Sequence, residues 1–140
     1  MIILSCDHAG FDYAQKLMKY FSNKKIDFKY MGPTNYQPDD DYPDFIAPAT
    51  KEVLKSKDNF GIFFCGSGIG ANMVANRQIG IRAVCAQDYT VAYLARKDED
   101  ANVLTIGTRL VSYRSALKII KVFLTSEFEG GRHARRIAKY

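Results

Sequence analysis

The chain has 140 residues, of which 47% are hydrophobic and 25% charged, a balance that indicates one globular domain over residues 1–140 and excludes an intrinsically disordered chain. Its net charge of +5 includes a local basic cluster at residues 130–140, which hold three arginines and one lysine but no acid. The chain shows no nucleic-acid-binding motif, so we expect no polynucleotide partner. No apolar run approaches the roughly 18 residues of a membrane span, and the N-terminus lacks the basic and apolar regions of a signal peptide, so we expect a cytoplasmic protein with no membrane partner.

Short apolar runs that alternate with amphipathic segments predict the secondary structure in chain order. We expect five strands, at residues 1–6, 25–31, 59–65, 81–86 and 102–107. We expect helices between them, at residues 9–22, from about Pro43 to Lys55, at 69–76, at 90–97 and at 112–125. Residues 33–45 are acidic and rich in turn-forming types, which predicts a loop before the second helix.

Strands this apolar, separated by helices, are typical of a parallel sheet that is buried on both faces. Because crossover connections are right-handed, the expected product is a doubly wound α/β sandwich with a five-stranded parallel sheet. Ligands bind such sheets at the carboxyl ends of the strands. Polar and reactive residues gather there, at Cys6-Asp7-His8, Cys65-Gly66-Ser67-Gly68, Gln87-Asp88 and Gly107-Thr108-Arg109.

The glycine-rich turn after Cys65 allows several interpretations. Gly66, Gly68 and Ala71 fit a dinucleotide-binding pattern, but that pattern normally follows the first strand of its domain and here follows the third. A phosphatase loop would need an arginine where the chain has Ala71. A buried structural cysteine before an ordinary turn remains open. The three cysteines, Cys6, Cys65 and Cys85, lack CxxC spacing, which argues against a disulfide framework or a zinc site.

A catalytic interpretation uses every part of this turn. A helix N-terminus and free backbone amides stabilise a nearby thiolate, so Cys65 is expected to act as a base. The amides of the turn, with Ser67, could hold an oxyanion. Together these groups suit removal of a proton from a carbon next to a carbonyl, with the enolate oxygen held by the turn.

Other candidates have both structural and functional interpretations. Asp7 could cap the first helix, whereas His8 beside it could move protons or contact an anion. In the basic tail, Arg132 and Arg136 are four residues apart and would share one face of a helix, where they could grip a phosphate, although a solvated basic terminus is an alternative.

The motifs "SCDHAGF", "DYPDF", "CGSGIGANMVANR", "GIRAV", "ANVLTIGTR" and "GGRHARR" together resemble the ribose-5-phosphate isomerase B family, which is similar to the galactose-6-phosphate isomerase subunits. The resemblance runs in order from residue 2 to about residue 138. It implies a Rossmann-like three-layer α/β/α sandwich and a cofactor-free aldose–ketose isomerase of the pentose phosphate pathway. It also implies a homodimer, or a dimer of dimers, whose sites are shared across the subunit interface.

The resemblance also implies site residues, and we expect no cofactor and no metal. Cys65 would transfer the proton between carbons. Ser67 and the turn Gly66, Gly68, Ile69 and Gly70 would hold the anion. Other substrate-binding residues would be Asp7, His8, Tyr42, Arg109, Arg132, His133 and Arg136, with the basic tail 127–140 packing at a subunit interface.

The chain departs from the family at one position. Members that isomerise ribose 5-phosphate commonly carry His-Asn where this chain has Asp98 and Glu99. We expect Asp98 to take over opening of the sugar ring and Glu99 to lie beside the substrate, since a carboxyl can perform the same acid–base work. The expected reaction interconverts D-ribose 5-phosphate and D-ribulose 5-phosphate through a cis-enediolate. Alternatives are a hexose 6-phosphate isomerase of allose or galactose type and a catalytically inactive sugar-phosphate binding protein.

Overall fold

The computed structural model describes residues 1–140 and contains one five-stranded parallel sheet with strand order β2-β1-β3-β5-β4. The strands are β1 (Ile2–Cys6), β2 (Phe28–Tyr30), β3 (Phe60–Cys65), β4 (Ala83–Cys85) and β5 (Val103–Gly107). The helices are the short 3-10 turn η1 (His8–Gly10), α1 (Phe11–Lys24), α2 (Tyr42–Val53), α3 (Ile69–Ala75), α4 (Tyr89–Glu99), α5 (Tyr113–Thr125) and α6 (Arg132–Ile137).

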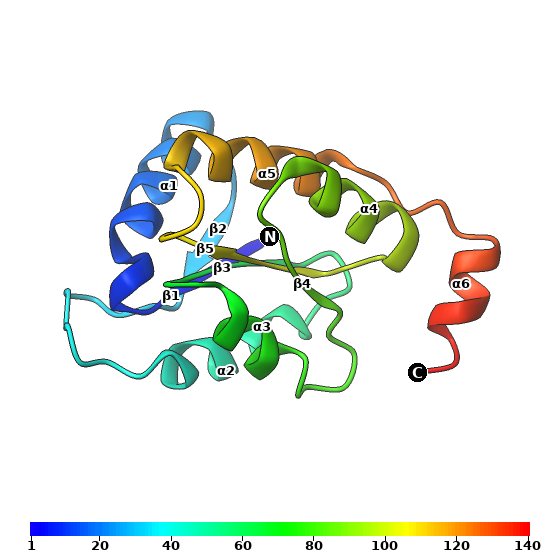
Figure 1. Ribbon diagram of the computed structural model, residues 1–140, viewed down its shortest axis with the longest axis horizontal. Helices are drawn as coiled ribbons and strands as arrows, with labels where there is room; N and C mark the ends of the chain where they lie inside the picture. The colour runs from blue at the N-terminus through cyan, green and yellow to red at the C-terminus, as the bar shows by residue number, and fades with distance from the viewer.

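The helices form two layers, one on each face of the sheet (Figure 1). Helices α1, α4 and α5 cover one face and helices α2 and α3 cover the other, which confirms the predicted three-layer α/β/α sandwich. The edge strands are shorter than predicted: β2 has three residues, and so does β4. The reason is that each edge strand has only one neighbour to pair with, so fewer of its residues join a ladder.

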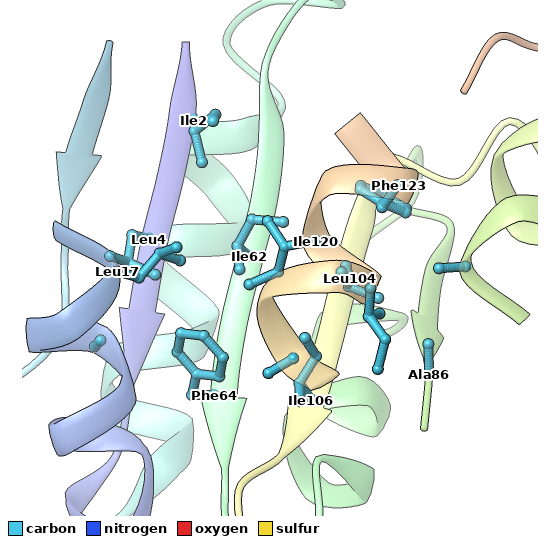
Figure 2. Close-up of a cluster of buried hydrophobic side chains, with 14 of the residues drawn as sticks. Ile2, Leu4, Leu17, Ile62, Phe64, Ala86, Leu104, Ile106, Ile120 and Phe123 are labelled. Atoms are coloured by element: carbon cyan, nitrogen blue, oxygen red, sulfur yellow. The ribbon is translucent and has the colours of Figure 1, made fainter. Parts of the chain in front are cut away.

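Two apolar clusters hold the layers together. The larger lies under α1, α4 and α5, where Leu4, Ile62 and Phe64 of the sheet meet Leu17 and Ile120 of the helices (Figure 2). The smaller lies on the opposite face, between β1, β3 and helices α2 and α3. Each burying helix contributes one apolar stripe, as the helical spacing of residues predicted. Cys6 belongs to the first cluster and Cys65 to the second.

The topology creates one crevice at the carboxyl edge of the sheet. From β1 the chain passes through α1 outward to β2, whereas from β3 it passes through α3 toward the other side, to β4. Because the connections diverge, the loops after β1 and β3 separate from each other and leave space at their junction. No helix of the chain is both long and apolar enough to cross a bilayer.

Candidate active site

A cavity of about 270 Å³ lies where β1 and β3 end. Its walls come from three loops that are far apart in the sequence: the loop after β1, the turn after β3 and the loop after β5. The lining residues are Asp7, His8, Ala9, Cys65, Gly66, Ser67, Arg109 and Leu110. Of the residues expected at the site, six therefore share this one cavity. Larger cavities exist near the opposite edge of the sheet, but they hold none of these residues.

Cys65 ends β3 with its side chain between the core and the cavity. The residue is 7% exposed, packs in the smaller apolar cluster and still lines the cavity. Burial raises the pKa of its thiol, and the adjacent Asp7 carboxylate raises it further, while the backbone amides of Gly68 and Ser67 oppose the shift. The amides therefore favour the thiolate as expected, but in the ligand-free chain burial and the neighbouring anion outweigh them, and the pKa of the thiol is raised.

The glycine turn after Cys65 packs tightly against the ends of β4 and β5. Gly68 caps α3 with φ of +77°, a conformation that side chains rarely adopt, and a Cβ there would lie 2.9 Å from Sγ of Cys85. A Cβ on Gly107 would meet the carbonyl oxygen of Ser67 at 2.5 Å. The Ser67 hydroxyl oxygen accepts a hydrogen bond from the amide of Ile69 at 3.3 Å. These contacts fix the turn against β4 and β5, beside the thiol.

Asp7 has the structural role that was predicted as one of its two alternatives. Its carboxylate accepts a hydrogen bond from the amide of Gly10 at 3.0 Å and caps η1. A Cβ on Gly10 would lie 2.5 Å from Cβ of Phe64, so η1 packs directly on β3. This close packing brings Asp7 beside Cys65 and leaves the residue only 3% exposed.

His8 lies at the mouth of the cavity and is held by an acid that sequence reasoning missed. Both the amide and the ring Nδ1 of His8 contact Oδ1 of Asp40, at 2.9 Å and 2.7 Å. The hydrogen bond to Asp40 raises the pKa of His8. Asp40 is the second acid of "DDDYP", and no pattern of spacing distinguishes it from its two neighbours.

Arg109 reaches the cavity from the loop after β5. Its amide donates to the carbonyl of Gly66 at 3.0 Å, and its guanidinium covers Gly66 so closely that a Cβ there would lie 3.1 Å from Cζ. Thr108 beside it was expected at this strand end, but no role was predicted for it. Its hydroxyl donates to the carbonyl of Ala9 at 2.8 Å and so joins the loops after β1 and β5.

Tyr42, Gly70 and Ile69 form a neighbouring surface rather than part of the cavity wall. Tyr42 is the first residue of α2, and its ring lies against Gly70, where a Cβ would be 2.7 Å from Cζ. Ile69 is 49% exposed. The structure therefore places these three predicted residues next to the glycine turn, on its outer side.

The residues predicted on α4 and in the tail lie apart from the cavity. Helix α6 packs against α4 at the end of the molecule opposite the loop between β1 and α1 (Figure 1). Arg132 and Arg136 are exposed there on a helix, as predicted, and Glu99 is exposed with its carboxylate 3.4 Å from the Tyr140 hydroxyl. Within one chain, none of these side chains reaches Cys65.

His133 differs from the two arginines beside it. It is 5% exposed, and its Nε2 lies 3.6 Å from Oδ1 of Asp98, while neither atom has a hydrogen-bond partner. Glu129 completes a group of three possible metal ligands with Asp98 and His133. The ammonium of Lys97 lies 2.8 Å from Glu129 and 4.0 Å from Asp98, so these acids already have a cationic partner.

Comparison with known proteins agrees with this geometry. The model of the Ribose/Galactose Isomerase family matches residues 2–140. Ribose-5-phosphate isomerase B of Escherichia coli is 33% identical over 137 residues, which are 97% of this chain and 91% of that protein.

Solved structures give the same result. The crystal structure of ribose-5-phosphate isomerase B from Mycoplasma genitalium with bound ribulose-5-phosphate has a TM-score of 0.95 and 37% identity, and covers 99% of this chain and 91% of that one. The corresponding enzyme from Clostridium thermocellum has a TM-score of 0.93 and 33% identity, over 99% and 93% of the two chains. With its cysteine, glycine turn and arginine on one crevice of this fold, the chain belongs to the ribose/galactose isomerase family.

Proposed function

We propose that this protein is an aldose–ketose isomerase that interconverts D-ribose 5-phosphate and D-ribulose 5-phosphate, in the cytoplasm. The cavity that joins Cys65, Ser67 and Arg109 carries the proposal. It offers a thiol for carbon-bound protons, a turn for a developing oxyanion and a guanidinium for an anionic oxygen. Relatives named ribose-5-phosphate isomerase B, over nearly the whole chain, support the same reaction. Three free cysteines suit a reducing compartment.

In the proposed reaction the sugar gains and loses no atoms or electrons overall. Cys65, as thiolate, takes the proton from C2, and the electron pair of that bond forms a double bond between C1 and C2. The charge moves to the oxygen on C1, where the turn at Gly66, Ser67 and Gly68 stabilises it. Cys65 then returns the proton to C1, and the hydroxyl hydrogen on O2 moves to O1. Because the thiol is protonated at rest, the thiolate has to form as the substrate binds.

Substrate orientation comes from the groups around the thiol and from a second protomer. Asp7, His8 and Tyr42 are proposed to orient hydroxyl groups or the phosphate, beside Arg109. Arg132 and Arg136 lie on α6, at the far end of their own chain, where Arg132 acts only through its charge on Glu129 and neither guanidinium forms an ion pair. We propose that they complete the site of the other protomer in a homodimer, with the tail 127–140 at the interface. Binding energy from the phosphate then aligns the reacting carbons.

Asp98 is proposed to open the furanose ring of the aldose. Its Oδ1 is buried toward His133, whereas the side chain as a whole is 28% exposed, so Oδ2 is the oxygen that can meet a substrate. The reverse reaction separates ring opening from proton transfer, because a 2-ketopentose 5-phosphate has no free hydroxyl that could close a furanose ring. In Asp98→Asn we expect slow turnover of ribose 5-phosphate, with exchange of the C1 proton of ribulose 5-phosphate in deuterated water retained. Equal losses in both assays would show that Asp98 does not open the ring.

A coupled isomerase assay on a panel of sugar phosphates tests the function itself. We expect turnover of ribose 5-phosphate, and a loss of about 10²–10⁴-fold in Cys65→Ala, the range of general acid–base catalysis. Greater activity on allose or galactose 6-phosphate would assign the hexose reaction instead. Binding of sugar phosphate without any exchange of the C2 proton would identify a binding protein that has lost catalysis.

A further inference from the structure

Asp40 is not among the residues expected at the site, yet it contacts the site residue His8 directly. Its Oδ1 lies 2.7 Å from the ring Nδ1 of His8 and 2.9 Å from the amide nitrogen of the same residue. The two residues are 32 positions apart, at the end of β1 and just before α2. We propose that Asp40 is a positioning residue, which holds His8 as an imidazolium with its Nε2–H directed to an anionic oxygen of the substrate.

The burial of Asp40 supports the proposal that its partner, His8, is positively charged. Its side chain is 3% exposed, and its second oxygen, Oδ2, is buried without a hydrogen-bond partner. A buried carboxylate with only half of its oxygens satisfied is costly unless a cation lies beside it. The imidazole of His8 is the group in position to be that cation, because it is the only side chain that forms an ion pair with Asp40.

The contact with Asp40 also decides which ring nitrogen of His8 is free. Nδ1 is occupied by the carboxylate, so Nε2 remains for a ligand. His8 lines the cavity with Cys65 and Arg109, and its side chain is 28% exposed, so the free nitrogen can reach a bound molecule. A ring with Nδ1–H bound to a carboxylate has a fixed orientation, as in other carboxylate–histidine pairs.

The charged groups that face His8 favour its protonated form. Asp40 and Asp7 both raise its pKa, and burial opposes them with a smaller effect than the Asp40 hydrogen bond. Cys65 across the cavity is a neutral thiol at rest, and Arg109 is the one cation on the cavity wall. Two anions therefore outweigh one cation around the ring. The imidazolium persists to higher pH than an unpaired histidine would.

The role of Asp40 rests on the proposed function, but its first test does not require activity. The chain has two histidines, so His133→Gln assigns their signals in an NMR titration. We expect His8 to titrate above the ordinary value of about 6.5 and its midpoint to fall in Asp40→Asn. Asp39→Asn removes an exposed acid one position away and is the matched control, with no expected change. An unchanged midpoint in Asp40→Asn, or an equal fall in Asp39→Asn, would overturn the proposal.

Kinetics on ribose 5-phosphate test what the imidazolium does. Near neutral pH we expect KM in Asp40→Asn to rise roughly tenfold, the size of one charge-assisted hydrogen bond, with a smaller change in kcat. The ratio of the mutant and wild-type KM values should fall as the pH is lowered, because acid restores the proton to His8 in the variant. Taking this ratio cancels the titration of the substrate phosphate. A ratio that is constant with pH would mean a merely structural role and would overturn the proposal.

A double-mutant cycle separates an indirect effect from a direct one. If Asp40 acts through His8, then Asp40→Asn has no further effect on KM in the His8→Asn background. Additive losses would contradict the proposal even where each single variant binds substrate poorly. Circular dichroism of each variant checks that it is folded. An inactive wild type whose His8 still titrates with a raised, Asp40-dependent midpoint would refute the proposed function while leaving the Asp40–His8 pair intact.

Discussion

Cys65 occupies an environment that works against its own ionisation. The thiol is at the boundary between an apolar cluster and the cavity, and the carboxylate of Asp7 lies beside it. A base with a raised pKa holds an abstracted proton firmly, but it has to be deprotonated first. The amides of Ser67 and Gly68 supply part of the required stabilisation, and bound substrate with its cationic partners has to supply the rest.

Replacing Asp7 by Asn tests this balance at a single residue. Asn keeps an oxygen that can cap η1 but removes the negative charge, so we expect the pKa of Cys65 to fall. The pH dependence of thiol alkylation, measured in a Cys85→Ser background, reports that pKa. The exposed Asp12→Asn serves as control. Faster alkylation of Cys65 only above the wild-type midpoint would contradict the expected direction.

At the scale of elements, close packing of glycines determines how the loops of the site are held. A Cβ on Gly10 would meet the backbone of Phe64, which cannot move without disturbing β3. The atoms nearest to a Cβ on Gly70 belong to the ring and hydroxyl of Tyr42, the far end of a side chain that can rotate, and alanine is the better helix former. The two glycines therefore have different functions in the fold.

We expect Gly10→Ala to lower the free energy of unfolding by about 1–3 kcal/mol, the usual cost of overpacking. Gly70→Ala should change the free energy of unfolding by less than about 1 kcal/mol, since helix propensity offsets the displaced ring. It should reduce kcat/KM instead, because Tyr42 moves. Urea denaturation and steady-state kinetics on both variants distinguish these results. The reverse pattern, a stable Gly10→Ala and an unstable Gly70→Ala, would refute this account.

The helices and strands could be predicted from the sequence wherever a local pattern of residues determines them. The apolar runs ending at Cys6, Cys65 and Gly107 predicted the three central strands, because buried parallel strands need little else. The order of β4 and β5 in the sheet was not predictable, since adjacent strands of the chain can pair on either side. Asp40 was missed, and the role of Thr108 was not predicted, because both contacts come from loops that meet only in the folded chain. The net rise in the pKa of Cys65 was not predicted because burial, unlike a helix terminus, leaves no local pattern.

Within one chain, the residues predicted to form the site lie in two separate places. Cys65 and Arg109 share a cavity, whereas Arg132 and Arg136 lie on α6, at the opposite end of the chain. The contacts that hold α6 against α4 include the Lys97–Glu129 ion pair and the buried His133. They keep the tail at the end of the molecule that lies away from the cavity. A second copy of the chain is the simplest source of the missing cations.

Mixed dimers test this division directly. Cys65→Ala is co-expressed with the double variant Arg132→Ala/Arg136→Ala under different affinity tags, and the mixed dimer is isolated on both. One of its two sites then has an intact thiol and an intact tail, so about half of the wild-type kcat should return. Pairing Cys65→Ala with Arg109→Ala is the matched control, because both residues belong to one chain's cavity and no site is restored. A mixed dimer as inactive as its control would show that sites are not shared.

The thiol of Cys85 under the glycine turn complicates chemical labelling of this protein. Cys6 and Cys65 are buried, whereas Cys85 is half-exposed, so Cys85 is a second target for an alkylating inhibitor. Its sulfur lies where a Cβ on Gly68 would be only 2.9 Å away, and a carboxamide added there has no room unless the turn moves. Inactivation of the wild type by such a reagent therefore does not by itself identify Cys65 as the base, and protection by substrate has the same ambiguity.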